Sequence, residues 1–199
     1  MKPKILAVLG SYREGHTIDR VAAEILAAAA EQGATTEIIQ LRGEPIEFCT
    51  NCRQCTQSPG PSPGPCPQRD AMASIIERIE AADALVFGAP VNFWTVNALF
   101  KRFQERLVGY AYWPWGTPGP KLRRPGKNKS AVLLIATAMP ALMARFTTSA
   151  MSQLNKTAAT VGAKRIGQLY IGQAALDETQ NLSRQVQKKA RRLGVKLLR

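Results

Sequence analysis

Four cysteines lie within eighteen residues of this 199-residue chain, in the stretch IEFCTNCRQCTQSPGPSPGPCPQRD (46–70). Three of them form C-x-x-C-x-x-C and the fourth follows after ten residues, giving the set Cys49, Cys52, Cys55 and Cys66. Cys-x-x-Cys spacing lets two thiolates reach one metal centre, and four such thiolates suit either a 4Fe–4S cluster or a tetrahedral zinc ion. Free or reversibly oxidised thiols are the third interpretation. His16 is the only histidine, so mixed Cys/His sites have little support.

The compartment of the protein bears on this choice. The N-terminal apolar run is only six residues long (5–10) and no small-residue cleavage site follows it, which is not typical of a signal peptide. No segment approaches the roughly 20 apolar residues that span a bilayer. We therefore expect a cytoplasmic protein without membrane association, where the reducing pool argues against a structural disulfide cluster.

Two further segments carry polar or aromatic groups directly after apolar runs. GSYREGHT (10–17) joins a predicted strand to a predicted helix, so backbone N–H groups and the side chains of Ser11, Arg13, His16 and Thr17 favour a phosphate ligand there. It matches neither G-x-G-x-x-G nor the P-loop pattern, and an ordinary capped turn is the alternative. In FGAPVNFW (87–94), aromatic and amide groups could flank a flat heteroaromatic ring, although a Phe-Trp pair after a strand is often part of the core.

These segments must be positioned by an alternation of strands and helices. Hydrophobic periodicity predicts five strands, at 4–10, 35–41, 84–90, 130–138 and 163–172. It predicts helices at 17–33 with a threonine N-cap, 69–83, 96–109, 145–161 and 178–198. The connections are too long for hairpins, which indicates right-handed crossovers and a parallel sheet. We expect one α/β domain over 1–199, with a cysteine loop (46–68) and an aromatic/basic loop (109–128) as insertions.

Taken together, the motifs resemble the flavodoxin-like NADPH-dependent FMN reductase family, and more narrowly its iron-sulfur flavoprotein branch. The family pattern has G-S-P-R-x-x-G-N-T after the first strand, C-x-x-C-x-x-C...C, D-D-M before a helix, A-D starting the third strand, and G-S-P-V-Y-F before L-K-x-F-x-D-R. The matching segments here are GSYREGHT, CTNCRQC...C, RDAM, AADALVFGAPVNF and LFKRFQER. The resemblance covers about residues 4 to 107 and keeps the order of its parts. It implies a three-layer sandwich with a five-stranded parallel sheet of order 2-1-3-4-5.

The resemblance also implies that the chain binds FMN. It assigns the FMN phosphate to Ser11, Arg13, His16, Thr17 and Ile18, and the isoalloxazine ring to Ala89, Pro90, Val91, Asn92 and Phe93. Departures from the family pattern include Tyr12, His16, Asn92 and Glu105. Asn92 replaces a tyrosine that the family often places near the flavin, so Trp94 is added as a candidate contact. Weaker candidates follow the fourth strand, at Thr137 and Ala138.

The implied activity is oxidoreduction carried by the flavin, with no protein acid or base assigned. A 4Fe–4S cluster on the four cysteines would make the chain an electron carrier between NAD(P)H or another reductant and an acceptor. Without the cluster, it would be a plain NAD(P)H-dependent FMN or quinone reductase. The partners are then a small-molecule or protein electron donor and acceptor. Family members are commonly dimers or tetramers, so a homo-oligomer is expected, and the loop 109–128 could be a flavin lid, a subunit contact or a self-packed loop.

The net charge of +13 is concentrated in one part of the chain. Residues 108–199 contain 16 basic residues and two acidic residues, whereas residues 1–107 contain 11 basic and 12 acidic. Arg123, Arg124 and Lys127 could therefore contact the 2'-phosphate of NADPH. A basic nucleic-acid-binding α/β protein is a second interpretation, but no recognisable RNA- or DNA-binding module accompanies the charge. A hydrolase has little support because the chain has no G-x-S-x-G motif.

Overall fold

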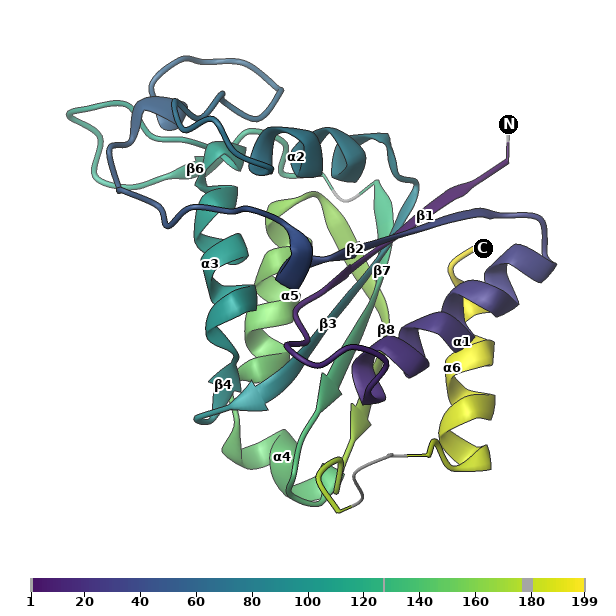
Figure 1. Cartoon of the computed structure of the whole chain (residues 1–199). Helices are drawn as coiled ribbons and strands as arrows, with labels where there is room; N and C mark the ends of the chain where they lie inside the picture. Colours follow the sequence, from purple (N-terminus) through teal and green to yellow (C-terminus); the bar gives the residue numbers. More distant parts are fainter. Residues whose placement is uncertain (1, 127, 177–180, 199) are drawn as a thin grey trace.

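A computed structural model describes residues 2–126, 128–176 and 181–198 of the chain (Figure 1). Five parallel strands form the sheet in the order β2-β1-β3-β7-β8, which confirms the predicted order 2-1-3-4-5. Their bounds are β1 Lys4–Leu9, β2 Thr35–Gln40, β3 Ala84–Asn92, β7 Lys129–Ala136 and β8 Ala163–Ile171. The two-residue strand β4 (Thr95–Val96) pairs antiparallel with the end of β3. All five predicted strands are therefore present, close to the predicted bounds.

Helices cover both faces of the sheet and make the three-layer sandwich that was predicted (Figure 1). The helices are α1 Thr17–Glu31, α2 Met72–Ala81, α3 Ala98–Arg106, α4 Ala141–Thr147, α5 Ala150–Thr160 and α6 Arg184–Lys196. Helices α1 and α6 pack on one face, and α2, α3 and α5 pack on the other. The central strands β1, β3 and β7 are apolar along most of their length because both of their faces are covered.

Three helical predictions differ from the structure. Helix α1 has His16 at its N-cap, with Thr17 as a buried first helical residue, so the predicted threonine cap is wrong. The segment predicted as one helix at 145–161 contains two helices, and the backbone N–H of Ser149 at the break donates to the carbonyl of Trp94 at 2.9 Å. The final helix begins at Arg184, where the Ser183 hydroxyl accepts from the backbone of Val186, and 177–180 lie outside the described residues.

The aromatic/basic loop is more ordered than its sequence indicates. A short hairpin forms from β5 (Ala111–Tyr112) and β6 (Lys121–Leu122), after a 3-10 turn at Leu107–Tyr110. Two further 3-10 turns, at Leu41–Gly43 and Gln54–Thr56, lie before and within the cysteine loop. Figure 1 shows the two inserted loops together, beyond the carboxyl end of α3. Within the described residues, no helix has the length and apolarity needed to cross a membrane.

Candidate functional site

A pocket of about 320 Å³ opens at the carboxyl ends of the central strands. Parallel α/β sheets bind their ligands at this edge, beyond the strand ends. The lining comes from the ends of β3 and β7, the start of α1 and the loops after β1, β7 and β8: Ser11, Tyr12, Arg13, His16, Thr17, Ile18, Pro90, Val91, Asn92, Ala136, Thr137, Ala138, Ala174 and Ala175. Segments far apart in the chain thus meet in one concave site.

The structure brings eight of the eleven predicted cofactor residues into this pocket: Ser11, Arg13, His16, Thr17, Ile18, Pro90, Val91 and Asn92. Ala89 is fully buried inside β3, and Phe93 and Trp94 are exposed at the turn beyond it. Thr137 and Ala138 line the pocket, as the sequence indicated more weakly. Ala174 and Ala175 were missed, and the signal that could have found them is their place directly after the last strand.

The loop between β1 and α1 is held against the start of α3. The Asn97 side chain accepts from the backbone N–H of Phe100 at 3.1 Å and donates its amide to the carbonyl of Gly10. The Tyr12 hydroxyl accepts from the backbone N–H of Leu99 at 3.2 Å. A side chain at Gly10 would meet Phe100 Cβ at 2.8 Å, which explains why glycine ends the first strand. The phosphate-binding candidates are therefore carried on a fixed loop.

His16, in this loop, lines the pocket and has a polar ring atom without a hydrogen-bond partner among the described residues. Its ring nitrogen Nδ1 is buried and has no hydrogen-bond partner within the described part of the chain. Buried polar atoms are rarely left unpaired, so such an atom indicates a missing partner. The residue also forms the N-cap of the fifteen-residue helix α1, and helix N-termini favour anions. These features fit a phosphate group of FMN at this end of the pocket.

The opposite wall of the pocket is formed by the loops after β7 and β8, which are joined by backbone hydrogen bonds. The backbone N–H of Thr137 donates to the carbonyl of Ile171, and the N–H of Ala174 donates to the carbonyl of Thr137, both at 2.9 Å. Gly172 lets the chain after β8 lie against the start of α4, because a Cβ there would lie 2.3 Å from the backbone nitrogen of Ala141. This wall presents small side chains, so it suits the approach of a flat ring.

A strained turn lies next to the pocket. Phe93 and Trp94 join the antiparallel pair β3 and β4 and have φ values of 47° and 69°. This two-residue turn with positive φ at both positions is usually built from Asn and Gly. Large residues rarely adopt it, and the strain costs about 1–3 kcal/mol at each position. The two side chains are 95% and 56% exposed, so the interpretation of this pair as core is wrong.

All four cysteines line a second cavity, of about 210 Å³. They are free thiols, with Cys55 buried, Cys49 half-buried, and Cys52 and Cys66 exposed. The other lining residues are Thr50, Asn51, Arg53, Gln68, Glu105, Arg106 and Val108. The fold thus brings Cys66 to the three cysteines of the C-x-x-C-x-x-C motif, despite the ten residues between them.

The backbone of the motif directs the N–H of Gln54 toward the sulfur of Cys52. Asn51 and Arg53 have φ values of 54° and 60°, in the left-handed region. Alternation of this kind makes concave N–H nests that bind anions, including many iron-sulfur centres. The backbone N–H of Gln54 and the side chain of Thr50 lower the pKa of Cys52. Burial, together with the neighbouring cysteines, raises the pKa of Cys55.

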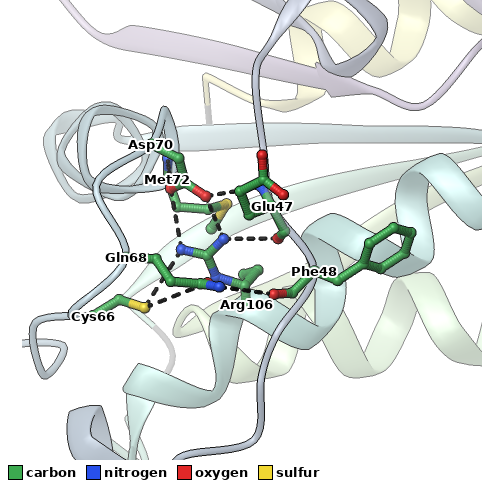
Figure 2. Close-up of polar contacts among 7 residues, drawn as sticks. All are labelled: Glu47, Phe48, Cys66, Gln68, Asp70, Met72 and Arg106. Carbon is green, nitrogen blue, oxygen red and sulfur yellow. Dashed lines mark hydrogen bonds and ion pairs between the residues drawn. The ribbon is translucent and has the colours of Figure 1, made fainter.

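A buried ion pair closes the base of the cysteine loop (Figure 2). The Arg106 guanidinium pairs with the Asp70 carboxylate, and their side chains are only 1% and 5% exposed. Arg106 Nη1 also donates to the carbonyl of Glu47 at 2.8 Å, and Nη2 lies 3.4 Å from Cys66 Sγ. Asp70 accepts in addition from the backbone N–H groups of Glu47 and Met72. These contacts join the start and the end of the loop to α3.

The aromatic/basic loop packs on the cysteine loop. The Arg123 guanidinium donates to four backbone carbonyls, those of Cys55, Ser58, Gly60 and Gly109. Arg124 donates to the carbonyl of Pro61 and pairs with Glu80 at 2.8 Å. Both arginines thus have partners within the protein, and their interpretation as ligands of a 2'-phosphate stays a prediction. Lys127 lies outside the described residues.

Four thiols around one cavity, an N–H nest and a buried guanidinium are the donor set and surroundings expected for an iron-sulfur cluster. Among the described residues, the structure shows no group of three or more His, Cys, Asp or Glu side chains that could hold a metal ion. The four cysteines line the cavity without forming such a group. A single zinc ion needs convergence, with each sulfur at about 2.3 Å. In a 4Fe–4S cluster each thiolate binds a different iron.

The two cavities lie at opposite ends of one helix. Asn97, just before α3, supports the loop of the first pocket, and Arg106, the last residue of α3, lines the second. A nine-residue helix is about 14 Å long. Figure 1 shows α3 running from the turn at β4 to the inserted loops. The lid interpretation of the loop 109–128 is therefore not supported by its position.

The match to a family model places the chain in a known class of flavoproteins. Residues 3–175 match the NADPH-dependent FMN reductase family, and the chain belongs to this family. An iron-sulfur flavoprotein of Methanocaldococcus jannaschii is 31% identical over 103 residues, which are 52% of this chain and 51% of that protein. An iron-sulfur flavoprotein of Archaeoglobus fulgidus is 29% identical over 147 residues, 68% of each chain. The chain matches about half the length of several of these relatives.

Solved structures confirm the flavodoxin-like fold. An FMN-dependent NADH-azoreductase from Bacillus anthracis, in complex with FMN, has a TM-score of 0.73 and 13% identity. The similarity covers 99% of this chain and all of that one. An NAD(P)H:quinone oxidoreductase from Methanothermobacter marburgensis has a TM-score of 0.71 and 18% identity, with 98% of each chain covered.

Proposed function

We propose that the protein is an FMN-dependent oxidoreductase that passes electrons between NAD(P)H or another reductant and an acceptor, through a 4Fe–4S cluster. The pocket at the carboxyl ends of β1, β3, β7 and β8 carries the flavin part of the proposal, because eight residues chosen for FMN from the sequence meet there. Family membership supports the same cofactor. FMN supplies the redox chemistry, since it exchanges electrons in pairs or singly.

The residues of the chain bind and orient the flavin. Ser11, Arg13, His16, Thr17 and Ile18 hold the phosphate at the start of α1, with His16 Nδ1 providing a buried polar contact. Pro90, Val91 and Asn92 line the ring, with Ala89 behind them in the strand and Phe93 and Trp94 at the margin. The small residues after β7 and β8 form the opposite wall. Burial between these walls excludes water from one side of the ring.

The four cysteines hold the cluster in this proposal. All four line one cavity as free thiols, and relatives named iron-sulfur flavoproteins match the chain. The cluster supplies one-electron transfer, which couples a two-electron donor to one-electron acceptors. A plain FMN or quinone reductase with a thiol-rich loop is the alternative.

We propose further that the protein is a homo-oligomer. Exposed apolar side chains gather near the flavin pocket, on the turn after β3 and on helix α4: Phe93, Trp94, Leu142, Met143 and Phe146. The backbone hydrogen bond from Ser149, between α4 and α5, to Trp94 holds the turn next to the end of α4. A second copy of the chain would cover this surface. Sedimentation velocity of the wild type and of Phe146→Glu tests it: we expect an oligomer that the substitution weakens, and a monomeric wild type would contradict the proposal.

One set of measurements on protein purified without oxygen tests the cofactors. We would record the visible spectrum, release the flavin with acid, and assay iron and sulfide. Flavin with about four irons per chain, as a 4Fe–4S cluster requires, supports the full proposal. Flavin without iron leaves the plain reductase. A colourless protein that also fails to take up added FMN contradicts the proposed function.

A further inference from the structure

The cavity of the four cysteines has a buried guanidinium in its wall. Arg106 ends α3, and its side chain is 1% exposed. Its Nη2 atom lies 3.4 Å from Cys66 Sγ and donates toward it. Burying an arginine side chain without hydrogen-bond partners costs free energy, so the partners of its N–H groups indicate what the residue does.

The remaining contacts fix the direction of this guanidinium. Asp70 binds it through both carboxylate oxygens, and the Glu47 carbonyl accepts from Nη1. Asp70 is held in turn by the backbone N–H groups of Glu47 at 2.9 Å and Met72 at 3.0 Å. Nη1 donates to Glu47 and Asp70, and Nη2 donates one N–H to Asp70. The second N–H of Nη2 is therefore directed at the Cys66 sulfur. Figure 2 shows this arrangement between the loop and α3.

Cys66 is the cysteine that most needs such support. It is separated from the C-x-x-C-x-x-C motif by ten residues rich in Pro and Gly, and it is exposed. Cys52, by contrast, receives hydrogen bonds from its own segment, at Thr50 and Gln54. Within its own segment the Cys66 thiol donates to Gln68 Oε1 at 3.9 Å, and the N–H directed at its sulfur comes from Arg106 on α3.

We propose that Arg106 is a positioning residue for the cluster, which holds Cys66 as a ligand and raises the reduction potential of the site. The inference rests on the proposed function. One-electron reduction adds a negative charge to the cluster and breaks no bond to the protein. A fixed cation and an N–H directed at a ligand sulfur stabilise the more negative state, and such contacts set the potentials of iron-sulfur centres.

Variants of Arg106 and of Asp70 distinguish control of the reduction potential from a purely structural role in holding the cysteine loop. Arg106→Gln removes the cation and the sulfur contact, and Arg106→Lys keeps the charge without the planar fork. Asp70→Asn leaves the cation without its counter-charge. Arg102→Gln is the matched control, because it removes a guanidinium from the same helix but not from the cavity lining.

The experiment uses the full chain, loaded with iron and sulfide without oxygen. Iron and sulfide per chain are measured first, and the midpoint potential follows from a titration with dithionite. We expect a more negative potential in Arg106→Gln, a smaller negative shift in Arg106→Lys, a positive shift in Asp70→Asn, and none in Arg102→Gln. Opposite signs at residues 106 and 70 identify electrostatic control, because damage to the loop would shift both variants alike.

The outcomes distinguish the two proposals. A wild type that takes up no iron or sulfide contradicts the cluster itself, and the role of Arg106 falls with it. If the wild type does take up iron and sulfide, but all four variants have the same midpoint potential as the wild type, the proposed role of Arg106 is overturned and the cluster is not. If Arg106→Gln lowers the free energy of unfolding without changing the midpoint potential, Arg106 only stabilises the cysteine loop, and the inference is also overturned. If Arg106→Gln fails to fold, the Arg106→Lys and Asp70→Asn shifts decide.

Discussion

The guanidinium carbon of Arg53 lies 3.7 Å from the centre of the Trp113 ring and 4.1 Å from that of Trp115. Arg53 stands inside the C-x-x-C-x-x-C motif, between the second and third cysteines, and its Nη2 donates to the Trp113 carbonyl at 2.8 Å. The backbone N–H of Trp113 donates back to Thr56 at 2.9 Å. The aromatic/basic loop therefore clamps the cysteine motif from outside, and the two insertions act as one structural unit.

The clamp predicts an energetic coupling between Arg53 and Trp113. We expect Trp113→Ala and Arg53→Gln each to reduce the free energy of unfolding by about 1–3 kcal/mol, since a partly buried cation–π contact contributes about 0.5–2 kcal/mol and packing is lost as well. The double variant should lose less than the sum of the two, by about 1 kcal/mol. Urea denaturation of the four proteins measures this. Additive losses would show that the rings do not stabilise Arg53.

The close packing around Gly64, in the cysteine loop, predicts that a larger residue at this position destabilises the protein. Its backbone N–H donates to the carbonyl of Gly109 at 2.8 Å, and a Cβ there would lie 1.8 Å from the carbonyl oxygen of Cys55. Gly64→Ala must therefore displace backbone, at a cost of about 1–3 kcal/mol or more. Gly43→Ala is the control, because no atom lies within 4 Å of a Cβ there. Denaturation midpoints compare the two, and equal midpoints would contradict this packing.

The same position shows what the sequence could and could not predict. The run TQSPGPSPGP suggests a loop free to bulge, but Gly64 inside it packs against Cys55 and Gly109. Carbonyls of the same run accept hydrogen bonds from Arg123 and Arg124, at sequence separations of 65 and 63 residues. Local composition carries no information about partners so distant in sequence. The strands and helices were predictable because apolar runs of strand length alternate with helical periods, and the strand order followed from the resemblance to the family. The pocket lining after β1 and β3 was predictable from motifs, whereas Ala174 and Ala175 have no distinctive chemistry.

The exposed pair at the turn shows a second limit. Asn92-Phe93-Trp94-Thr95 does not resemble a tight hairpin, since large residues disfavour positive φ. Propensity therefore favoured a buried aromatic pair, and the antiparallel pairing of β4 with β3 determined the turn instead. Such departures from local preference concentrate at functional sites, and this one adjoins the pocket proposed to bind the flavin.

The Asp70–Arg106 pair predicts a pH dependence of stability. Burial acts to raise the pKa of Asp70, but hydrogen bonds from Arg106 and from the backbone of Glu47 and Met72, with the charge of Arg106, hold it below its usual value. The folded-state pKa is thus below the unfolded value of about 3.9. The carboxylate stabilises the fold above that value, and this contribution is lost as the pH falls through the folded-state pKa.

The test compares the wild type with Asp70→Asn by denaturation at several pH values. We expect the difference in unfolding free energy to be largest near neutral pH and to shrink below about pH 4. Glu105→Gln, on the exposed side of α3, controls for a general change of charge. A difference between wild type and Asp70→Asn that stays constant down to pH 2 would contradict the ion-pair explanation.

His16 predicts how the flavin phosphate is recognised. Its buried Nδ1 atom has no partner in the described part of the chain, so a phosphate oxygen would complete its hydrogen bonding. A hydrogen bond to a charged group contributes about 1.5–3 kcal/mol, so His16→Ala should weaken FMN binding roughly tenfold to a hundredfold. His16→Asn should retain most of the affinity, since the amide keeps a donor. Quenching of flavin fluorescence in flavin-free protein measures both, and riboflavin, which lacks the phosphate, should bind the wild type and His16→Ala equally. An equal loss for FMN and riboflavin would instead assign His16 to the ring.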